Sequence, residues 1–264
     1  MDRERLRRIR NFQSEDWYPA LFIRPISIGI MLVIADWKFI TANRLTTLAN
    51  ICKLASAWFI LRGRSPGEIV TAVVLLQLGL IFDHLDGTMA RYRRTFTKLG
   101  SYYDKVSDLL TWCVISAAIG WRAYGATGEA YYILLALASA YALGSMGYMK
   151  WLVSAESERL RWLEAREDPP AAIARRTAPI QIAPPPERTR ADWMRWFVRM
   201  APRFLKFEET DLYFWVAVGL FIHREDLLVW LLFASQIGVL AAMLVKRTRE
   251  IAGVDRRMRD LGDR

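Results

Sequence analysis

Long apolar runs separated by short charged segments dominate this sequence. A helix that crosses the hydrocarbon core of a bilayer needs about 20 mostly apolar residues. Six runs fit this requirement, and the fifth is the shortest, with Asp211 near its start. We therefore predict an all-α integral membrane protein with six transmembrane helices, at residues 43–62, 67–90, 99–121, 129–153, 209–223 and 226–246.

A further apolar stretch, from Ala20 to Ile40, precedes the first predicted crossing. Its apolar pattern is interrupted by Arg24, Pro25, Asp36 and Lys38. Such a mixture is typical of an amphipathic helix that lies in the membrane interface. We predict a juxtamembrane helix here, and a seventh crossing is the alternative.

The loops between the apolar runs differ in charge. The connection from Arg91 to Lys98 carries four basic residues, whereas the loop from Trp121 to Glu129 carries only Arg122. Because basic loops stay in the cytoplasm, both termini and the second-to-third and fourth-to-fifth loops are predicted to face it. Arg62 and Arg64, in the first outer loop, weaken this bias without reversing it.

The same pattern divides the chain into four parts. Residues 1–42 form a cytoplasmic N-terminus and the interfacial helix, without the apolar core of a cleavable signal peptide, and residues 43–155 form the first four crossings. Residues 156–207 combine a proline-rich stretch, predicted to be an extended linker, with a basic amphipathic segment at 191–207. Residues 208–264 form the last two crossings and a basic tail.

Composition supports a membrane protein over a nucleic-acid-binding one. Hydrophobic residues make up 53% of the 264 residues, and the net charge of +10 comes mainly from Lys and Arg that flank apolar runs. This placement fits contact with lipid headgroups better than a nucleic-acid groove. Cys52 and Cys113 lie inside apolar stretches without metal-ligand spacing, so we expect them to be buried apolar residues.

Four aspartates stand at the facing ends of two predicted crossings. Asp83 and Asp86 are three residues apart, and Asp104 and Asp108 are four apart, so each pair shares one face of a helix. The first pair closes one apolar run and the second opens the next, across a short loop. We expect the two helices to form an antiparallel pair that brings the four carboxylates together near the cytoplasmic edge of the bilayer.

Converging carboxylates repel one another in a medium of low dielectric and need compensating cations. Mg²⁺ and Mn²⁺ prefer oxygen ligands and commonly bridge to phosphates, so the four aspartates indicate a divalent metal site. The alternative, a solvated rim, fits less well because Asp83 follows a long apolar run and Asp108 precedes another. His84, a single histidine beside carboxylates, is expected to support the site rather than to bind the ion.

A bare stretch of helix follows the first aspartate pair. Glycine inside a helix costs about 1 kcal/mol relative to alanine, so Gly87 suggests a close approach. Gly87, the small Ala90 and the guanidinium of Arg91 together suit a flat base and a pyrophosphate. For Gly87 and Ala90 alone, close helix packing is the alternative.

The pattern D-x2-D-G-x2-A-R-x8-G-x3-D-x3-D, from Asp83 to Asp108, resembles the signature of the CDP-alcohol phosphotransferases, and every defined position is matched. Asn43-Arg-Leu-Thr46 is similar to the N-x-x-T donor element of this family, with Ala42 in place of the usual proline. The six-crossing layout is also similar, so the resemblance covers roughly residues 20 to 250, although only 83–108 is specific.

The resemblance implies roles for individual residues. Asp83, Asp86 and Asp104 would bind two Mg²⁺ or Mn²⁺ ions, and Asp108 would either bind metal or act as general base. The donor would be a CDP-linked substrate, and its contacts would come from Asn43, Thr46, Asp83, Gly87, Ala90, Arg91 and Gly100.

The implied reaction transfers a substituted phosphate group from a donor such as CDP-diacylglycerol to an alcohol, with release of CMP. Tyr148-Met-Lys150 is similar to an element of members whose acceptor bears a phosphate, whereas a lysine that only sets topology is the alternative. An aminoalcohol phosphotransferase acting on diacylglycerol and a non-enzymatic transporter or scaffold remain the other hypotheses. The resemblance also implies a tendency to form homodimers.

Overall fold

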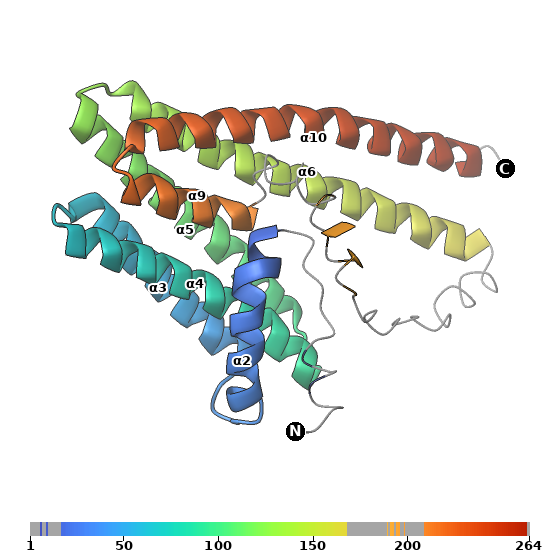
Figure 1. Ribbon diagram of the computed structural model, residues 1–264. Helices are drawn as coiled ribbons and strands as arrows, with labels where there is room; N and C mark the ends of the chain where they lie inside the picture. Colours follow the sequence, from blue (N-terminus) through green and yellow to red (C-terminus); the bar gives the residue numbers. More distant parts are fainter. Residues whose placement is uncertain are drawn as a thin grey trace. The chain divides into compact units, whose positions relative to one another are not determined.

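The computed structural model describes residues 17–167 and 209–262, and of the remainder only residues 6, 9, 189, 191, 192, 194, 195 and 198. Over the described ranges, all regular structure is helical (Figure 1). The elements are a π-helical turn η1 (Pro19–Ile23) and the helices α2 (Arg24–Ile34), α3 (Ala42–Arg62), α4 (Pro66–Arg93), α5 (Lys98–Thr127), α6 (Tyr131–Glu167), α9 (Glu209–Phe221) and α10 (Glu225–Gly262). The proline-rich stretch and nearly all of the basic segment 191–207 lie outside the described residues.

The all-helical class predicted from the sequence is confirmed for the described residues. Each of the six predicted segments corresponds to one helix, from α3 to α10. Two helices are much longer than their apolar runs: α6 continues to Glu167 and α10 to Gly262. Both extensions are rich in charged residues, so the apolar pattern ended before the helices did.

Three helices, α4, α6 and α10, are long and apolar enough to cross a membrane. The helical segments Pro19–Ile34 and Thr210–Phe221 are apolar but shorter. Helices α3 and α5 have sufficient length, with 21 and 30 residues. Their polar residues, such as Asn50 in α3 and Asp104 in α5, lower their mean hydropathy.

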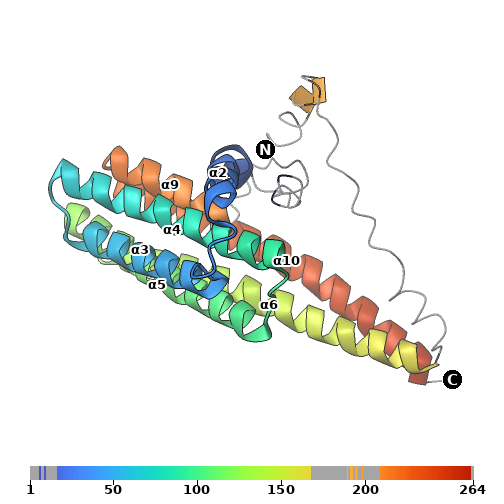
Figure 2. The same ribbon diagram turned by 90° about the horizontal axis from the view of Figure 1, so that it is seen from below.

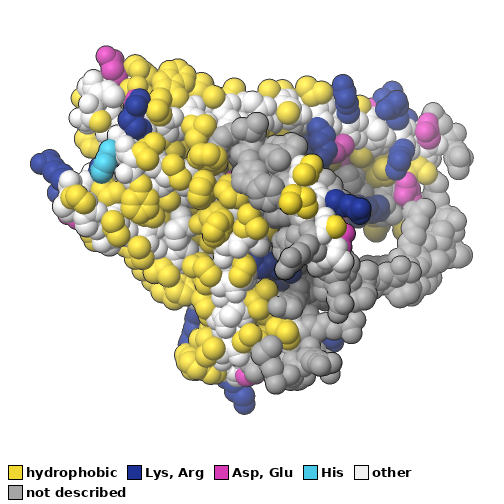
Figure 3. Space-filling model, in the orientation of Figure 1, with side chains coloured by type: hydrophobic (Ala, Val, Ile, Leu, Met, Phe, Trp, Pro, Cys, Tyr) yellow, Lys and Arg dark blue, Asp and Glu magenta, His cyan; other side chains and the backbone are white. Residues whose placement is uncertain are grey.

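Large hydrophobic side chains are exposed along the helices. Examples are Trp58 on α3, Val74 on α4 and Leu110 on α5, which are 56%, 49% and 60% exposed. Figure 3 shows hydrophobic side chains spread over the visible surface of α4 and α9. An apolar surface of this extent is expected for helices that face lipid rather than water.

Side-chain caps fix where three of the helices begin. Thr41 accepts a hydrogen bond from the backbone N–H of Arg44 at the start of α3, and Thr97 accepts one from Gly100 at the start of α5. Before α4, Ser65 and Glu68 form a reciprocal capping box. These caps satisfy backbone donors that would otherwise lack partners at a helix start.

The described chain forms two compact units. The first unit contains the described residues within 1–141 and 187–235. The second contains the described residues within 142–186 and 236–264. The four aspartates and the helices α2, α3, α4, α5 and α9 belong to the first unit. The second unit consists, over its described residues, of the later parts of α6 and α10.

Helix α3 is the centre of the first unit. It contacts both α4 and α5, while α2 runs steeply across α4 and α9 packs along α4 (Figure 2). The sequence predicted that α4 and α5 would pair directly, but their main packing is through α3. Small residues allow this arrangement: Ala49, Ala57 and Ala72 are buried, and Ser56 Oγ donates a 2.7 Å hydrogen bond to the carbonyl oxygen of Ala72.

Gly79 lies where α4 closely approaches α3, and replacing it with leucine is expected to destabilise the protein. A Cβ atom at this position would lie 2.8 Å from Lys53 Cγ and 3.2 Å from the carbonyl oxygen of Ala49. Overpacking of this kind costs about 1–3 kcal/mol. We expect Gly79→Leu to lower the melting temperature of the detergent-solubilised protein, measured by circular dichroism. Gly125→Leu is the control, because no atom lies within 4 Å of a Cβ there, and equal melting temperatures for both variants would contradict the packing described here.

Candidate functional site

Arg93, at the end of α4, forms hydrogen bonds with the connection between α2 and α3. The guanidinium of Arg93 donates hydrogen bonds of 2.7–3.1 Å to the carbonyl oxygens of Ala35, Trp37 and Ile40. Tyr92 adds a 3.0 Å hydrogen bond from its hydroxyl to Asp36 Oδ1. The first turn of α3 is thereby held beside the last turn of α4, which is where the candidate site lies.

A tight turn connects α4 to α5 at the same edge. Arg94 adopts a left-handed conformation with φ 56°, and the N–H of Thr95 returns to the carbonyl oxygen of Ala90 over 3.0 Å. Thr97 then caps α5. Because the turn is short, Asp83 and Asp86 at the end of α4 and Asp104 and Asp108 at the start of α5 reach the same region, as the sequence predicted.

The deeper part of the site is an ion-pair cluster. The ammonium of Lys53 on α3 lies 3.0 Å from Asp83 Oδ1 and 2.7 Å from Asp108 Oδ1. The lysine side chain is 1% exposed, and the two aspartates are 19% and 21% exposed. Three helices thus place one cation between two carboxylates.

A second layer lies one turn nearer the ends of the helices. Thr46 Oγ1 donates a hydrogen bond to Asp86 Oδ2, and both residues are buried. Thr46 lies seven residues before Lys53, so the two side chains share a face of α3. Asp86 likewise lies three residues after Asp83 on α4, and Asp104 lies four before Asp108 on α5.

Three of the aspartates are close enough to bind one ion. Asp83, Asp104 and Asp108 each offer a carboxylate oxygen, and these oxygens lie within 4.8 Å of one another. Hard divalent cations such as Mg²⁺ and Mn²⁺ prefer such an all-oxygen set, so the residues fit the predicted metal. Asp86 lies outside this trio and bonds to Thr46. His84 is also outside it, and its Nδ1 lies 3.0 Å from the carbonyl oxygen of Leu80.

A cavity of about 240 Å³ opens beside the second layer. Six of the seven residues predicted to contact the donor line it, and only Asp83 does not. The complete lining is Ala42, Asn43, Thr46, Asp86, Gly87, Ala90, Arg91, Thr95, Phe96, Thr97, Gly100, Ser101 and Asp104.

The lining of this cavity combines two carboxylates, Asp86 and Asp104, with groups that attract an anion. Helices α3 and α5 both begin at it, and the N-terminus of a helix carries partial positive charge. Arg91 adds a guanidinium, and Gly87 leaves room for it, since a Cβ there would lie 3.3 Å from Arg91 Nη2. Gly100 similarly lets α5 approach α3, with a Cβ position 3.2 Å from Asn43 Oδ1.

Lys53, which the structure places in contact with two of the four aspartates, was not among the residues predicted from the sequence. A charged residue ten positions into a predicted crossing is costly and usually functional, so its position alone was the available signal. The rest of the run from 43 to 62 is apolar enough to predict a crossing despite this charge.

The predicted acceptor residue, Lys150, lies on α6 in the second compact unit. Its side chain is exposed, and the nearby rings of Tyr148 and Trp151 stack with centroids 6.2 Å apart.

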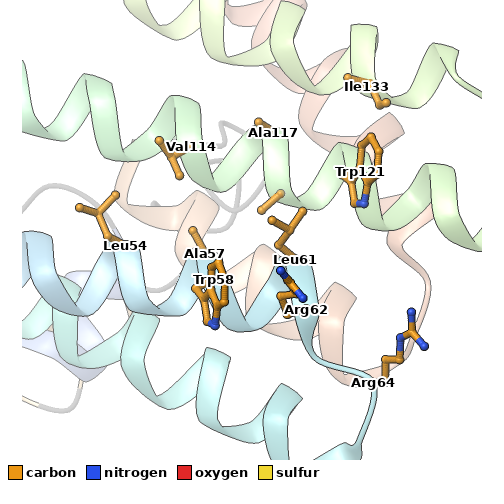
Figure 4. A pocket seen from close by; sticks show the side chains of 11 residues that line it. Leu54, Ala57, Trp58, Leu61, Arg62, Arg64, Val114, Ala117, Trp121 and Ile133 are labelled. Atoms are coloured by element: carbon orange, nitrogen blue, oxygen red, sulfur yellow. The ribbon is translucent and has the colours of Figure 1, made fainter.

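A second hollow, of about 870 Å³, lies along α3 and α5 at the other end of α3 (Figure 4). Its walls are mostly apolar, and Leu61 and Val114 point into the space between the helices. Arg62 stacks on the ring of Trp58, with 4.9 Å between the guanidinium carbon and the ring centroid. None of the predicted site residues lines it. An apolar, open groove on this surface fits contact with lipid rather than chemistry.

One comparison with known protein families gave a match that contains the candidate site. Residues 39–161 match the family model described as CDP-alcohol phosphatidyltransferase. The match contains α3, α4, α5 and all four aspartates. No curated protein matches the chain significantly.

Proposed function

Because residues 39–161 belong to the CDP-alcohol phosphatidyltransferase family, we propose that this chain transfers a substituted phosphate group from CDP-diacylglycerol to an alcohol and releases CMP. The observation that carries this proposal is the joining of two features at one edge of the first unit. A trio of carboxylates suited to a divalent cation, Asp83, Asp104 and Asp108, stands beside a cavity suited to a phosphate-bearing ligand.

The cavity beside Asp86 and Asp104 is where we propose that the CDP moiety binds. Arg91 can form paired hydrogen bonds to a pyrophosphate, in the geometry that guanidinium groups favour. The beginnings of α3 and α5 add backbone N–H groups and partial positive charge on the same wall. Gly87 and Ala90 leave a bare helix face against which a planar base can lie.

The carboxylates are proposed to hold Mg²⁺ or Mn²⁺. Asp83, Asp104 and Asp108 supply the oxygen trio, and Asp86 stands beside it with one oxygen bonded to Thr46. A bound divalent ion would neutralise charge on the pyrophosphate and stabilise CMP as leaving group.

Asp108 is proposed to accept the proton of the acceptor hydroxyl. As the proton moves to the carboxylate, the hydroxyl oxygen attacks the phosphorus that carries the diacylglycerol group. The new oxygen–phosphorus bond forms while the bond to the CMP oxygen breaks, so CMP leaves with its own phosphate. Proton acceptance by a positioned side chain contributes about 10²–10⁴-fold in rate.

The acceptor is proposed to be a small alcohol that itself bears a phosphate. The support is the Tyr148-Met-Lys150 element, in which the exposed ammonium of Lys150 is available to an anionic group. An aminoalcohol transferred to diacylglycerol is the alternative direction for the same chemistry, and a homodimer stays a prediction.

The topology proposed from the loop charges has six crossings, α3 to α6 with α9 and α10, and a juxtamembrane α2. The basic connection between α4 and α5 lies at the edge that contains the carboxylates and the cavity. Since basic loops remain in the cytoplasm, the site is proposed to face the cytoplasm.

Replacing Arg91 with lysine is expected to weaken donor binding. Lysine keeps the charge but cannot form the paired hydrogen bonds of a guanidinium. Since a hydrogen bond to a charged group contributes about 1.5–3 kcal/mol, the KM for the CDP-linked donor should rise about 10- to 100-fold. Arg94→Lys is the matched control, because Arg94 does not line the cavity. Steady-state kinetics that show the same KM for both variants and the wild type would remove Arg91 from the donor site.

The direction of transfer is tested with a matrix of donors and acceptors. Purified protein in Mg²⁺ or Mn²⁺ would be given CDP-diacylglycerol or CDP-aminoalcohols with soluble alcohols or diacylglycerol, and both CMP and lipid mass would be measured. CMP release from CDP-diacylglycerol with a phosphorylated alcohol supports the proposal. Product only from a CDP-aminoalcohol and diacylglycerol would reverse the direction, and ion movement in liposomes without any CMP would favour the transporter.

A further inference from the structure

Lys53 is a fixed part of the carboxylate cluster, although the proposed transfer reaction gives it no task. Its ammonium contacts Asp83 on α4 and Asp108 on α5 while its own backbone belongs to α3. The ring of Tyr213 on α9 lies 5.6 Å from the ammonium, a distance at which a cation and an aromatic ring attract each other. Four helices of the first unit therefore surround this single charge.

The stem of Lys53 is held as tightly as its charged end. Gly79 on α4 has no side chain at the point where Lys53 Cγ passes, and a Cβ there would lie only 2.8 Å away. The lysine side chain is 1% exposed. Moving the ammonium away from both carboxylates would leave buried charges without partners, which is strongly destabilising. The cation is thus built into the fold rather than placed on a flexible surface arm.

The position of the ammonium limits how many metal ions the cluster can take. It already contacts one oxygen of Asp83 and one of Asp108. In two-metal sites the ions lie about 3.5–4 Å apart and share bridging ligands. Asp83 and Asp108 also belong to the trio that would hold the first ion. A second ion would have to share these two carboxylates with both the first ion and the ammonium, and like charges would lie side by side in a medium of low dielectric.

We propose that Lys53 is a resident cation of the cluster and that the four aspartates therefore bind one divalent ion per chain, where the family resemblance implies two. This inference rests on the proposed metal site. Lys53 occupies the deeper layer with Asp83 and Asp108. The single ion belongs toward Asp104, which lines the donor cavity and makes no ion pair with Lys53.

Counting bound ions tests this inference directly. Purified wild-type protein would be titrated with Mn²⁺, and free ion would be measured by electron paramagnetic resonance after equilibrium dialysis. The expected count is one Mn²⁺ per chain at saturation. For Lys53→Gln, which removes the charge but keeps hydrogen-bond donors, the expected count doubles to two. Lys53→Arg keeps the charge and should stay at one.

A wild-type count of two or of none would overturn the inference, and so would a count of one for folded Lys53→Gln. Circular dichroism and gel filtration establish whether Lys53→Gln is folded. If it is not, the number of Mn²⁺ ions bound by the wild type still tests the inference. CMP release measured on the same preparations separates this inference from the proposed function, because a transferase with two ions per chain would contradict only the role of Lys53.

Discussion

Replacing Asp108 with asparagine is expected to lower the rate of CMP release by a factor of about 10²–10⁴, the range that a general base contributes. Asparagine has nearly the same shape and can still accept a hydrogen bond from Lys53, but it cannot take a proton from an alcohol. Because Asp108 also belongs to the oxygen trio, Mn²⁺ binding by this variant is measured alongside, to separate loss of the base from loss of the ion. Initial rates of CMP release at saturating donor measure the effect.

The control for this substitution is Asp226→Asn. Asp226 pairs with Arg224 at the start of α10, with 3.0 Å between Asp226 Oδ1 and Arg224 Nε, and has no contact with the cluster. Its variant should release CMP at the wild-type rate. If Asp108→Asn retained more than about a tenth of the wild-type rate, the proton-acceptor role would be wrong, since the smallest expected loss is about 10²-fold.

Asp104→Asn and Asp83→Asn are expected to differ in stability although both lose the metal ion. Comparing the two variants therefore separates the contribution of metal binding from that of the ion pair with Lys53. Asp104 belongs to the oxygen trio but makes no ion pair with Lys53, whereas Asp83 belongs to both. Asp104→Asn should therefore lose Mn²⁺ binding and CMP release while the free energy of unfolding in chelator stays the same. Asp83→Asn should also lose Mn²⁺ binding and CMP release. In addition, its free energy of unfolding should fall by about 1–3 kcal/mol, because the buried ammonium loses a charged partner.

Denaturant titration in detergent, with chelator present, measures the stability difference, and Mn²⁺ titration measures the binding. Equal stability of the two variants would mean that the Lys53–Asp83 contact contributes nothing to the fold. If Asp104→Asn kept the wild-type affinity for Mn²⁺, Asp104 would not be a ligand of the ion.

The helices could be predicted from the sequence because apolar runs of about 20 residues are a strong signal. The ends of α6 and α10 could not, because charged residues continue those helices beyond the apolar run. The placement of α3 between α4 and α5 was also missed. It depends on small residues such as Gly79 and Ala49 at particular contacts, and an apolar pattern does not say which neighbour a small residue faces.

The convergence of the aspartates could be predicted from the sequence, whereas the helix packing could not. Asp83 and Asp86, and then Asp104 and Asp108, follow helical spacing, and the turn between them is too short to let them diverge. Lys53 was not predicted as a site residue, because its two partners lie 30 and 55 residues away in the sequence. Contacts between distant residues follow from the packing of α3, which had itself not been predicted.

Alcohol-dependent release of CMP from CDP-diacylglycerol tests the central claim most directly. Wild-type protein, purified and returned to lipid with Mg²⁺ or Mn²⁺, is expected to release CMP when a phosphorylated small alcohol is added and to form a new lipid in equal amount. Asp108→Asn should release almost none under the same conditions. If the folded wild type released no CMP with any donor and acceptor pair, the proposed transferase function would be contradicted.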